Sequence, residues 1–586
     1  MRFLVRLVLS MLLLASLALG LLYATTPYPA FAARITAPNY GLVPGQEFPL
    51  TPERYAALRL GLAATALVAA AGLVASRRRG RRAVRGRRPP PTARWVALSR
   101  NERLVAGAVL LAAAGVHLWY AFGYPLTLDE VASYDFAVLP GAALTASYYP
   151  FPNNHLLPNL LVGAVHGLLP GADALLALRL LPTLLGLVVL GLGYELLLRY
   201  LPFSVATLSW GLFSLSPLPA FYAVAGRGYG WALAALLAGL AASLVLLQPR
   251  GAGRRRRQRA WVVFGLSAVL GLYAVPTHLY ALLGLGLALL VGFSRGRGRG
   301  RRLRWLHLAV LTLGVGLVVA VLYAPVVAVS GWPALVANRY VLRLSPAEFW
   351  PHVGPYYLLG TASELLGQRL VSALFFVAVA ALTPLVLTRG HLPEPTRRLG
   401  WLAYAQLLLW LGLVLGQRVY PPARTLLAVL LFLFVLVALA AQVGLGWGWP
   451  RARRQPTPRR VLAALVAVLA GYGGYRLHRE QVVIGQQARQ QQELRRAYRW
   501  LRARHPRRVW LPESARAYAL FWNHYALNAG EPPLPLVLAG GVMPAHIWLP
   551  RPGPAYKLQL ARPAGRPAAY ADAHVVLLPL ATEPLP

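Results

Sequence analysis

The chain has 586 residues, a net charge of +42 and a mean hydropathy of +0.52, and 57% of its residues are hydrophobic. A soluble protein of this length is rarely so apolar, and apolar runs of membrane-spanning length recur from end to end, so the sequence predicts an all-α polytopic membrane protein. The lack of cysteine excludes disulfides and thiolate metal sites. The aliphatic runs are too long for the alternating strands of a membrane barrel.

The positive charge gathers in short loops between the apolar runs. Arginine-rich stretches occur at residues 77–94, 254–259, 295–304 and 451–460. Basic loops of this kind stay in the cytoplasm, so they report the orientation of the spans. They also suit anionic lipid headgroups. We therefore expect the lipid bilayer, and no nucleic acid, as the partner of this charge.

The first apolar run, residues 4–24, is either a retained span or a signal peptide, for which Ala30-Phe31-Ala32 would be the cleavage site. Both alternatives leave the topology unchanged. Further spans are expected at residues 55–75, 103–122, 174–198, 203–222, 228–248, 260–277, 279–293, 305–324, 368–388, 399–416, 424–446 and 460–475. Every densely basic loop then falls on one side, so we predict about 13 spans with the N-terminus inside and the C-terminus outside.

Two segments depart from this pattern. The run 156–169 is short and lies between proline-rich stretches, which is typical of a re-entrant or interfacial helix. After residue 475 the hydropathy falls, and residues 478–505 are expected to form a polar linker helix. The strand-like stretches "PLVLAG", "HIWLP" and "HVVLLPL", with one helix, predict a small external α/β domain.

The predicted domain organisation therefore has three parts. These are two N-terminal transmembrane helices with a basic cytoplasmic loop, a transmembrane module whose first external loop spans residues 123–155, and a C-terminal extracytoplasmic α/β domain, with boundaries at 1–99, 100–475 and 476–586.

An acidic cluster stands out in the first external loop. The chain has only 17 acidic residues, yet Asp129, Glu130 and Asp135 lie within seven positions, just beyond the external end of the 103–122 run. A carboxylate there can accept a proton from an incoming hydroxyl. The alternative is an acidic cap on a surface helix. The polar "YPFPNNH" stretch that follows, with Asn153, Asn154 and His155, favours a functional site, because polar groups at a membrane surface are costly unless used.

The order of motifs in residues 100–445 resembles that of the GT-C glycosyltransferases of family 39, the protein O-mannosyltransferase and aminoarabinose-transferase type. The matching stretches are the Asp129-Glu130 pair after a first span, "PFPNNHLLPNLL", "ALRLLPTLLG" at 177–186, "SPLPAFYAVAGRGYG" at 216–230 and "YPPARTLL" at 420–427. This chain has Asn153-Asn154-His155 where family members commonly have His-Pro-Pro. Its first two spans have no counterpart in the minimal family module.

The resemblance implies a membrane enzyme with a lipid-linked donor. The donor would be a sugar on a polyprenyl phosphate, reached from the bilayer, and the acceptor would arrive from the external side. Asp129, with Glu130 beside it, would be the catalytic pair, with the aspartate as general base. The anomeric centre would be inverted in a single displacement.

Arginine suits the leaving phosphate of such a donor, because its planar fork binds phosphate oxygens. We expect Arg227, Arg424 and Arg418 to serve this purpose, since each lies in a predicted external turn. The alternatives are that Arg227 only snorkels to the interface and that Arg424 anchors a helix end.

Substrate contacts are expected from the polar residues nearby. His155 is a candidate for orienting Asp129, binding the acceptor, helping to hold a metal or capping a helix, and His278 is equally open. Asp135 is either structural or a partner of acceptor hydroxyls, and Tyr229 is expected to contact substrate. Related enzymes sometimes use a divalent cation, but the sequence has no tight His/Asp/Glu ligand set, so we predict no metal. The aromatic external segment 325–366 is either a sugar site or an interfacial belt.

The sequence thus favours a glycosyltransferase of the bacterial cytoplasmic membrane with an external active site. A polyprenyl-linked glycan transporter is the first alternative, but it should carry charges near the bilayer midplane, and Glu195, the one acid deep in a run, lies near its cytoplasmic end. A ligase moving a glycan from a diphosphate carrier is another alternative, and it would need further external arginines. The identity of the acceptor, whether protein, lipid or glycan, stays open.

Overall fold

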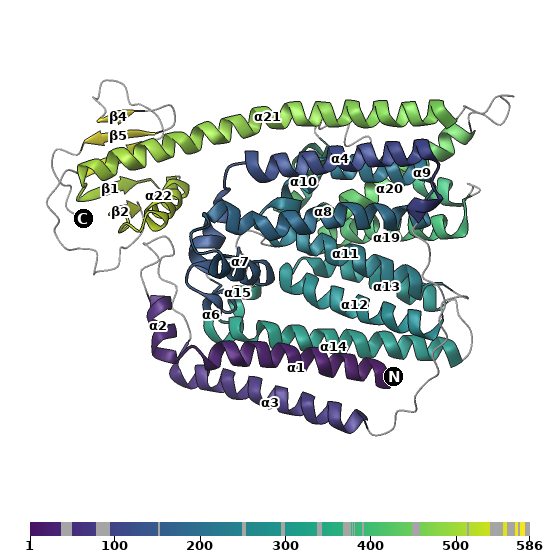
Figure 1. Cartoon of the computed structure of the whole chain (residues 1–586), viewed down its shortest axis with the longest axis horizontal. Coiled ribbons are helices and arrows are strands. Elements are labelled where there is room, and N and C mark those ends of the chain that lie inside the picture. Colours follow the sequence, from purple (N-terminus) through teal and green to yellow (C-terminus); the bar gives the residue numbers. More distant parts are fainter. Residues whose placement is uncertain are drawn as a thin grey trace.

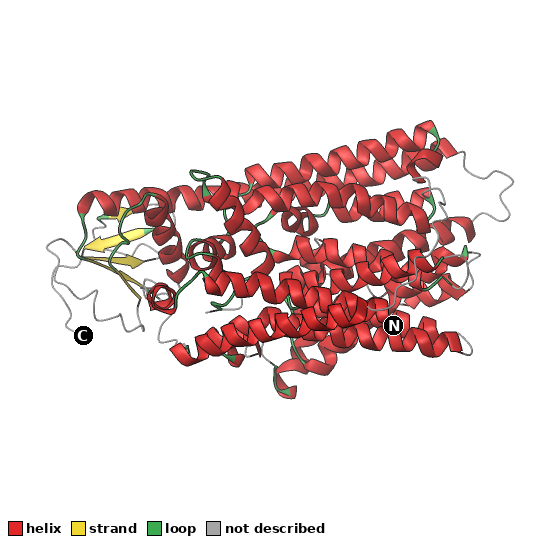
Figure 2. Cartoon of the chain, turned by 60° about the horizontal axis from the view of Figure 1, so that its bottom comes forward, coloured by secondary structure: helices red, strands yellow, loops and turns green. Residues whose placement is uncertain are grey.

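The computed structural model is a long helical bundle with a small sheet at one end (Figures 1 and 2). The N-terminus lies in the helical part and the C-terminus beside the sheet. The structure describes residues 1–36, 50–77, 94–149, 153–248, 253–294, 299–336, 343–366, 377, 379, 381–388, 392–447, 458–512, 515–538, 555–559, 569–571 and 575–579.

The helices of the first half follow the apolar runs. They are α1 (Arg2–Ala24), α2 (Tyr28–Thr36), α3 (Pro52–Arg77), η1 (Arg94–Ala97), α4 (Arg100–Gly123), α5 (Leu128–Ser133), the π-helical η2 (Tyr134–Val138), α6 (Ala142–Thr145), α7 (Leu156–Leu168), α8 (Ala174–Tyr200), α9 (Phe203–Ser214), α10 (Pro217–Val224), α11 (Gly228–Leu246), α12 (Arg254–Ala274) and α13 (His278–Ser294).

The second half continues the bundle and then leaves it. Its helices are α14 (Arg299–Ser330), α15 (Trp332–Val336), α16 (Pro346–His352), η3 (Val353–Leu358), α17 (Leu359–Leu366), α19 (Glu394–Gln417), η4 (Ala423–Leu426), α20 (Leu427–Trp447), α21 (Pro458–Arg504) and α22 (Arg516–Asn528).

Within the described residues, nine helices are long and apolar enough to cross a membrane, judged by length and composition. The expected count of about 13 spans is therefore not reached by this measure, although the multi-pass helical architecture is confirmed. Two of the expected spans correspond to the shorter apolar helices α9 and α13. Helix α7 has only 13 residues, in agreement with its expected short, non-spanning character. The expected span 368–388 lies partly outside the described residues.

One expected span is broken in two. Residues 203–222 form α9 and α10, and the break falls at Ser216-Pro217. Proline has no N–H to donate and its ring clashes with the preceding turn, so it is favoured at the first turn of a helix over the interior. Pro217 accordingly opens α10, with Ser216 as its N-cap residue.

Near the C-terminus, two helices that were expected to be separate are joined into one. The expected span 460–475 and the expected linker 478–505 are one continuous helix, α21, of 47 residues. At 1.5 Å rise per residue it is about 70 Å long. Figure 1 shows α21 running along one edge of the whole bundle and on to the sheet. Its polar second half therefore passes the C-terminal end of α4 and connects the bundle to the C-terminal domain.

The C-terminal domain is the predicted α/β unit. Its sheet has the order β2-β1-β3-β5-β4, with β1 (Arg508–Leu511) parallel to β2 (Leu536–Leu538) and β3 (Ala555–Gln559), and β5 (Val576–Pro579) antiparallel to β3 and β4 (Tyr570–Ala571). The stretch "HIWLP" lies outside the described residues.

The core of this domain extends into the segment that follows α4. Val131, Ala132 and Phe136 of α5 and η2 belong to the same buried apolar cluster as Trp522 of α22 and Leu501 of α21. Figure 1 places α22 next to the end of the bundle. The C-terminal domain is therefore packed directly on the helix that begins with the acidic pair.

Candidate active site

The acidic pair lies in the first turn of α5. Thr127 is the N-cap, its hydroxyl accepts a hydrogen bond from the Glu130 N–H, and the Glu130 carboxylate accepts one from the Thr127 N–H in return. This reciprocal capping box explains why the chain folds into a helix here, and it fixes the direction of the first turn. The spacing Thr-x-x-Glu was present in the sequence as a signal for this box.

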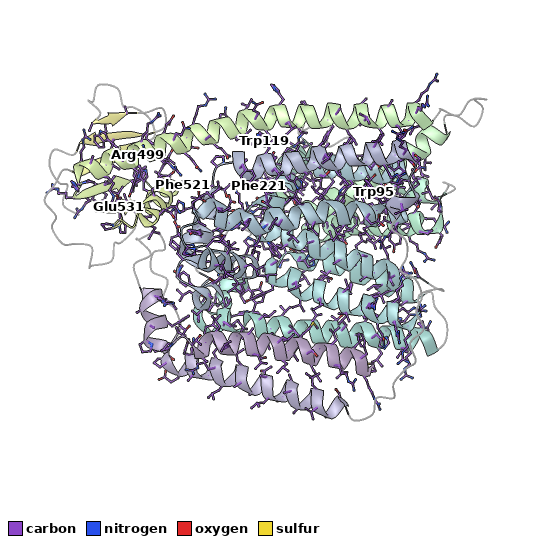
Figure 3. The ribbon with its side chains drawn as sticks, in the orientation of Figure 1. Trp95, Trp119, Phe221, Arg499, Phe521 and Glu531 are labelled. Atoms are coloured by element: carbon purple, nitrogen blue, oxygen red, sulfur yellow. The ribbon has the colours of Figure 1, made fainter. Side chains whose placement is uncertain are left out.

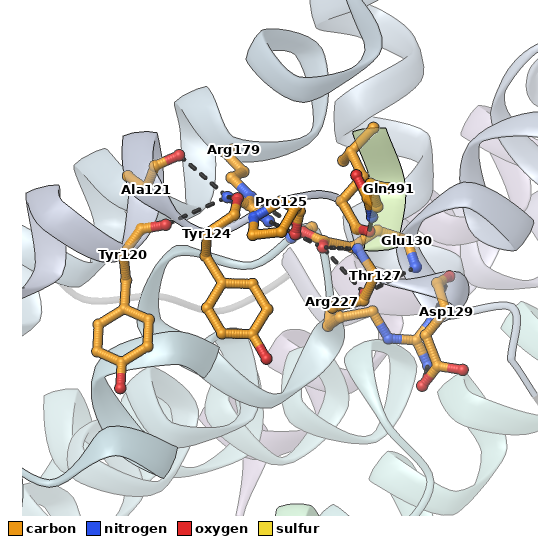
Figure 4. Close-up of polar contacts among 12 residues, drawn as sticks. Tyr120, Ala121, Tyr124, Pro125, Thr127, Asp129, Glu130, Arg179, Arg227 and Gln491 are labelled. Atoms are coloured by element: carbon orange, nitrogen blue, oxygen red, sulfur yellow. Dashed lines mark hydrogen bonds and ion pairs between the residues drawn. The ribbon is translucent and has the colours of Figure 1, made fainter. Parts of the chain in front are cut away.

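Glu130 is completely buried and fully paired. Arg179 of α8 donates two hydrogen bonds to its carboxylate, at 3.1 and 3.0 Å, and the Gly226 N–H donates a third at 3.1 Å. Burial by itself raises a carboxyl pKa, but the Arg179 charge and these hydrogen bonds lower the pKa of Glu130 below its usual value. Figure 4 shows this network between Arg179, Glu130 and Thr127. Glu130 therefore has no exposed atom with which to meet a substrate.

Asp129 has the opposite surroundings. Its side chain is 40% exposed, and its carboxylate lies 3.7 Å from the Arg227 guanidinium, which is only 2% exposed. In Figure 4 the Asp129 carboxylate points away from the Glu130–Arg179 pair. The acidic pair thus divides into one anchored carboxylate and one that is accessible beside a buried cation.

Arg227 ties together the loop segments around Asp129. One guanidinium nitrogen, Nη1, donates to the Asp129 carbonyl at 3.2 Å, the Ser133 hydroxyl at 2.6 Å and the Asn153 carbonyl at 3.0 Å. The Asn153 amide in turn donates to the Asp129 carbonyl at 2.9 Å. The predicted residues Arg227 and Asn153 therefore do meet Asp129, but largely through its backbone.

His155 and Asn154 lie behind this surface and are buried. The His155 Nδ1–H donates to the Ala274 carbonyl at 3.1 Å, while its Nε2 has no partner among the described residues. Burial and the nearby Arg227 charge lower the pKa of His155 well below its usual value, so the ring is neutral. Gly228 is needed beside it, because a Cβ there would lie 2.6 Å from the ring. The Asn154 amide donates to the carbonyls of Thr145 and Tyr148.

The other predicted residues are divided between two regions. Arg424 donates to the Tyr229 hydroxyl at 3.1 Å, and both line a cleft that also contains the buried His278. Arg424 also lines the chamber described below. Arg418 ends α19 in a left-handed conformation (φ 53°), where its carbonyl accepts from the Leu344 N–H, and it is not among the residues that line this cleft or the chamber.

Asp135 is not part of the Asp129 surface. Its carboxylate lies 2.8 Å from Nδ1 of His524 on α22, and both side chains are buried. The Asn528 amide contacts the other His524 nitrogen at 2.9 Å. Burial raises the pKa of Asp135, although the hydrogen bond from His524 opposes this. The residue therefore joins the first external loop to the C-terminal domain.

Asp129 faces a polar chamber made of two adjoining cavities. One has a volume of about 350 Å³ and is lined by Asp129, Arg227 and Tyr124, among others. The other has a volume of about 840 Å³ and reaches Arg424, Arg479 and Tyr420. The residues that line both cavities are Leu218, Tyr222, Glu364, Arg476 and Glu480.

Several of these lining residues were not singled out from the sequence. Arg476, Arg479 and Glu480 come from α21, at the junction between the expected span 460–475 and the expected linker helix 478–505. Their only local signal was a charged helix face that follows an apolar one. Arg179 lies in the stretch "ALRLLPTLLG", and the signal there was a single arginine within an apolar run. Glu364 and Tyr357 come from the aromatic segment 325–366, of which residues 337–342 lie outside the described residues.

The part of the chain that the structure describes contains no group of three or more His, Cys, Asp or Glu side chains that could hold a metal ion. The described residues that line the chamber bring the carboxylates of Asp129, Glu364 and Glu480, several guanidinium groups and aromatic hydroxyls.

No family model matches this sequence, and no curated protein matches it significantly. Among solved structures, the chain is similar to an Archaeoglobus fulgidus oligosaccharyltransferase in the apo form (TM-score 0.39, 14% identity, 63% of this chain and 55% of that chain). It is also similar to the oligosaccharyltransferase AglB of that organism in complex with an inhibitory peptide and a dolichol-phosphate (TM-score 0.38, 16% identity, 65% of this chain and 56% of that chain). A third similar structure is that of ArnT from Cupriavidus metallidurans in the apo state (TM-score 0.46, 16% identity, 83% of this chain and 97% of that chain).

The chain spans just over half the length of the two archaeal structures and nearly all of the third. At these identities and TM-scores the likeness decides nothing about activity.

Proposed function

We propose that this protein is a GT-C type membrane glycosyltransferase that moves a sugar from a polyprenyl-phosphate donor to an acceptor hydroxyl on the external face of a bacterial cytoplasmic membrane. The observation that carries the proposal is the placement of Asp129, an accessible carboxylate beside a buried arginine on a polar chamber lined by further arginines. The motif order of residues 100–445 adds to it.

In this reaction Asp129 accepts the proton of the acceptor hydroxyl. The acceptor oxygen forms a bond to the anomeric carbon on the face opposite the phosphate, while the bond between that carbon and the phosphate oxygen breaks. The lipid phosphate leaves with the electron pair, and the configuration at the anomeric carbon is inverted. The carboxylate must be accessible to the acceptor for this, which fits Asp129 and does not fit the buried, fully paired Glu130.

The arginines stabilise the charge that grows on the leaving phosphate. A preorganised cation at such a position lowers the barrier by several kcal/mol, on the order of what one oxyanion-hole donor contributes. We assign this role to Arg424, which faces the chamber, with Arg476 beside it. Arg227 is almost completely buried and bonds to the Asp129 segment, so we assign it to holding Asp129 in place.

A specific observation also supports a second candidate. A ligase that uses a diphosphate carrier needs further arginines to bind the second phosphate. Arg476 and Arg479 on α21 line the same chamber as Arg424. A transporter is less well supported, because Glu195, the one acid deep in an apolar run, lies near the end of that run and pairs at 3.0 Å with Arg199 on the next turn of the same helix.

The test presents membranes that contain the protein with radiolabelled sugars on polyprenyl monophosphate and, separately, with a glycan on polyprenyl diphosphate. We expect transfer from the monophosphate, and Asp129→Asn should reduce the rate by about 100-fold or more, since general bases contribute 10²–10⁴-fold. Glu394→Gln is the control, because this acid is exposed at the far end of α19 and pairs only with its helix neighbours.

The other possible results distinguish the glycosyltransferase from the ligase and test the assignment of the base. Transfer from the diphosphate alone would identify the ligase. Wild-type transfer by Asp129→Asn would remove Asp129 as the base.

A further inference from the structure

An apolar groove separates α4 from α21. Facing glycine and alanine residues ordinarily let two membrane helices pack in contact, but these two helices leave a cavity of about 690 Å³ between them. The lining side chains recur every three or four residues on one face of each helix. The small ones at its centre are Ala108, Ala112, Gly115, Ala470, Gly473 and Gly474.

The groove is open to the surface of the bundle and runs along the membrane direction. Gly115 and Gly474 are exposed, and a Cβ on either would meet nothing within 4 Å. The lining on α4 extends from Val105 to Trp119, which is about 21 Å at 1.5 Å per residue. That covers most of a hydrocarbon core of about 30 Å. Figure 3 shows Trp119 in the strip between the ribbons of α4 and α21.

The external end of the groove meets the polar chamber. Trp119 lines the groove, and its ring packs against that of Tyr120, which lines the chamber. On α21, Leu477 and Gln481 line the groove, while Glu480 between them lines the chamber. The groove and the chamber share no lining residue, but their linings are neighbours along both α4 and α21, so the apolar groove ends beside the cavity that contains Asp129.

We infer that this groove holds the hydrocarbon tail of the polyprenyl-phosphate donor, which enters sideways from the bilayer between α4 and α21. The occupant must be thin and apolar to lie among small side chains, and it must carry an anionic head to match the arginines of the chamber. A polyprenyl phosphate has both properties. This inference rests on the proposed function, because it locates one part of the donor at the proposed site.

The test compares donors that differ only in tail length. The double variant Gly115→Leu, Gly474→Leu fills the groove with side chains, and Gly107→Leu, Gly471→Leu is the matched control on the same two helices, because both of these glycines face open space and neither lines the groove. The measured quantity is the ratio of transfer rates with C55 and C10 prenyl-phosphate sugars. Wild type should prefer the long chain, because each additional buried methylene group adds to binding, and the double variant should lower this ratio about tenfold relative to the control.

A second measurement does not depend on activity. A C55 polyprenyl phosphate with a diazirine in its chain is photolysed with the wild-type protein, and the labelled peptides should map to α4 and α21. Label elsewhere, or a ratio equal to that of the control, would overturn the inference while leaving the proposed function intact. Label at the groove without any sugar transfer would leave the inference standing and overturn the function.

Discussion

At the residue scale, two adjacent carboxylates have different surroundings because consecutive side chains of a helix point about 100° apart. Glu130 points inward to Arg179 and Asp129 outward to the chamber. Breaking a buried ion pair by removing one partner leaves an uncompensated charge, which costs about 3–5 kcal/mol. The two residues should therefore respond to substitution in different ways, one in activity and the other in stability.

Glu130→Gln should lower the free energy of unfolding by about 3 kcal/mol, because it leaves Arg179 buried without a counter-charge. The measurement is the midpoint of thermal unfolding of the purified protein in detergent. Glu348→Gln is the matched control, since Glu348 closes the same kind of capping box with Ser345 but is exposed and has no ion pair with any described residue. An equal effect of both substitutions would show that the cap, and not the pair with Arg179, stabilises this region.

The same residue has a consequence for pH dependence. The folded pKa of Glu130 lies below its unfolded value, which is about 4.3. Its stabilisation is therefore present above that value and is lost as the pH falls through the folded pKa. Glu130→Gln should accordingly flatten the loss of thermal stability below about pH 4.

At the element scale, α5 is held from both sides. Arg179 and Arg227 of the bundle donate hydrogen bonds to it, and α22 of the C-terminal domain packs against its apolar side chains. The contact between Asp135 and His524 belongs to the second of these surfaces. The order of the helix that carries Asp129 therefore depends on a domain nearly 400 residues away in the sequence.

His524→Ala should loosen α5 without unfolding the bundle. It leaves the Asp135 carboxyl buried without its partner, which costs about 1–3 kcal/mol. Hydrogen exchange of the α5–η2 amides should become faster, while exchange in α11 stays as in wild type. The exposed His478 on α21 gives the control substitution, His478→Ala. Unchanged exchange in α5 would mean that the C-terminal domain does not brace this helix.

At the scale of the whole molecule, the acidic loop and the sheet lie at one end of the bundle, and helix ends flanked by arginines lie at the other. This is the arrangement that the positive-inside rule predicts for an external active site and an external C-terminal domain.

Single cysteines test this orientation directly, because the chain has none of its own. Ala503→Cys lies at the exposed end of α21 near the sheet, and Ser294→Cys lies at the exposed end of α13. A membrane-impermeant maleimide should label the first in intact cells and the second only after the membrane is opened. The reverse pattern would place Asp129 in the cytoplasm and end the proposal of an external reaction.

Much of the helical architecture was accessible from the sequence by itself. Apolar runs must become helices in lipid, because each backbone group needs an internal partner there, so the positions of α1, α3, α4, α8, α11, α19 and α20 follow from hydropathy. The short length of α7 and the α/β character of the C-terminal region were predicted in the same way. The acidic loop was located because carboxylates are rare in this chain.

Only the tertiary structure decided which carboxylate is buried and which residues complete the site. Arg179 lies 49 residues from Glu130, and Arg476 belongs to a helix more than 300 residues from Asp129. Local sequence patterns report periodicity and turns, whereas such pairings depend on how distant helices pack. The continuity of α21 and the contact of His524 with Asp135 were decided there too, since burial and charge pairing are properties of neighbours in space and not of neighbours in the chain.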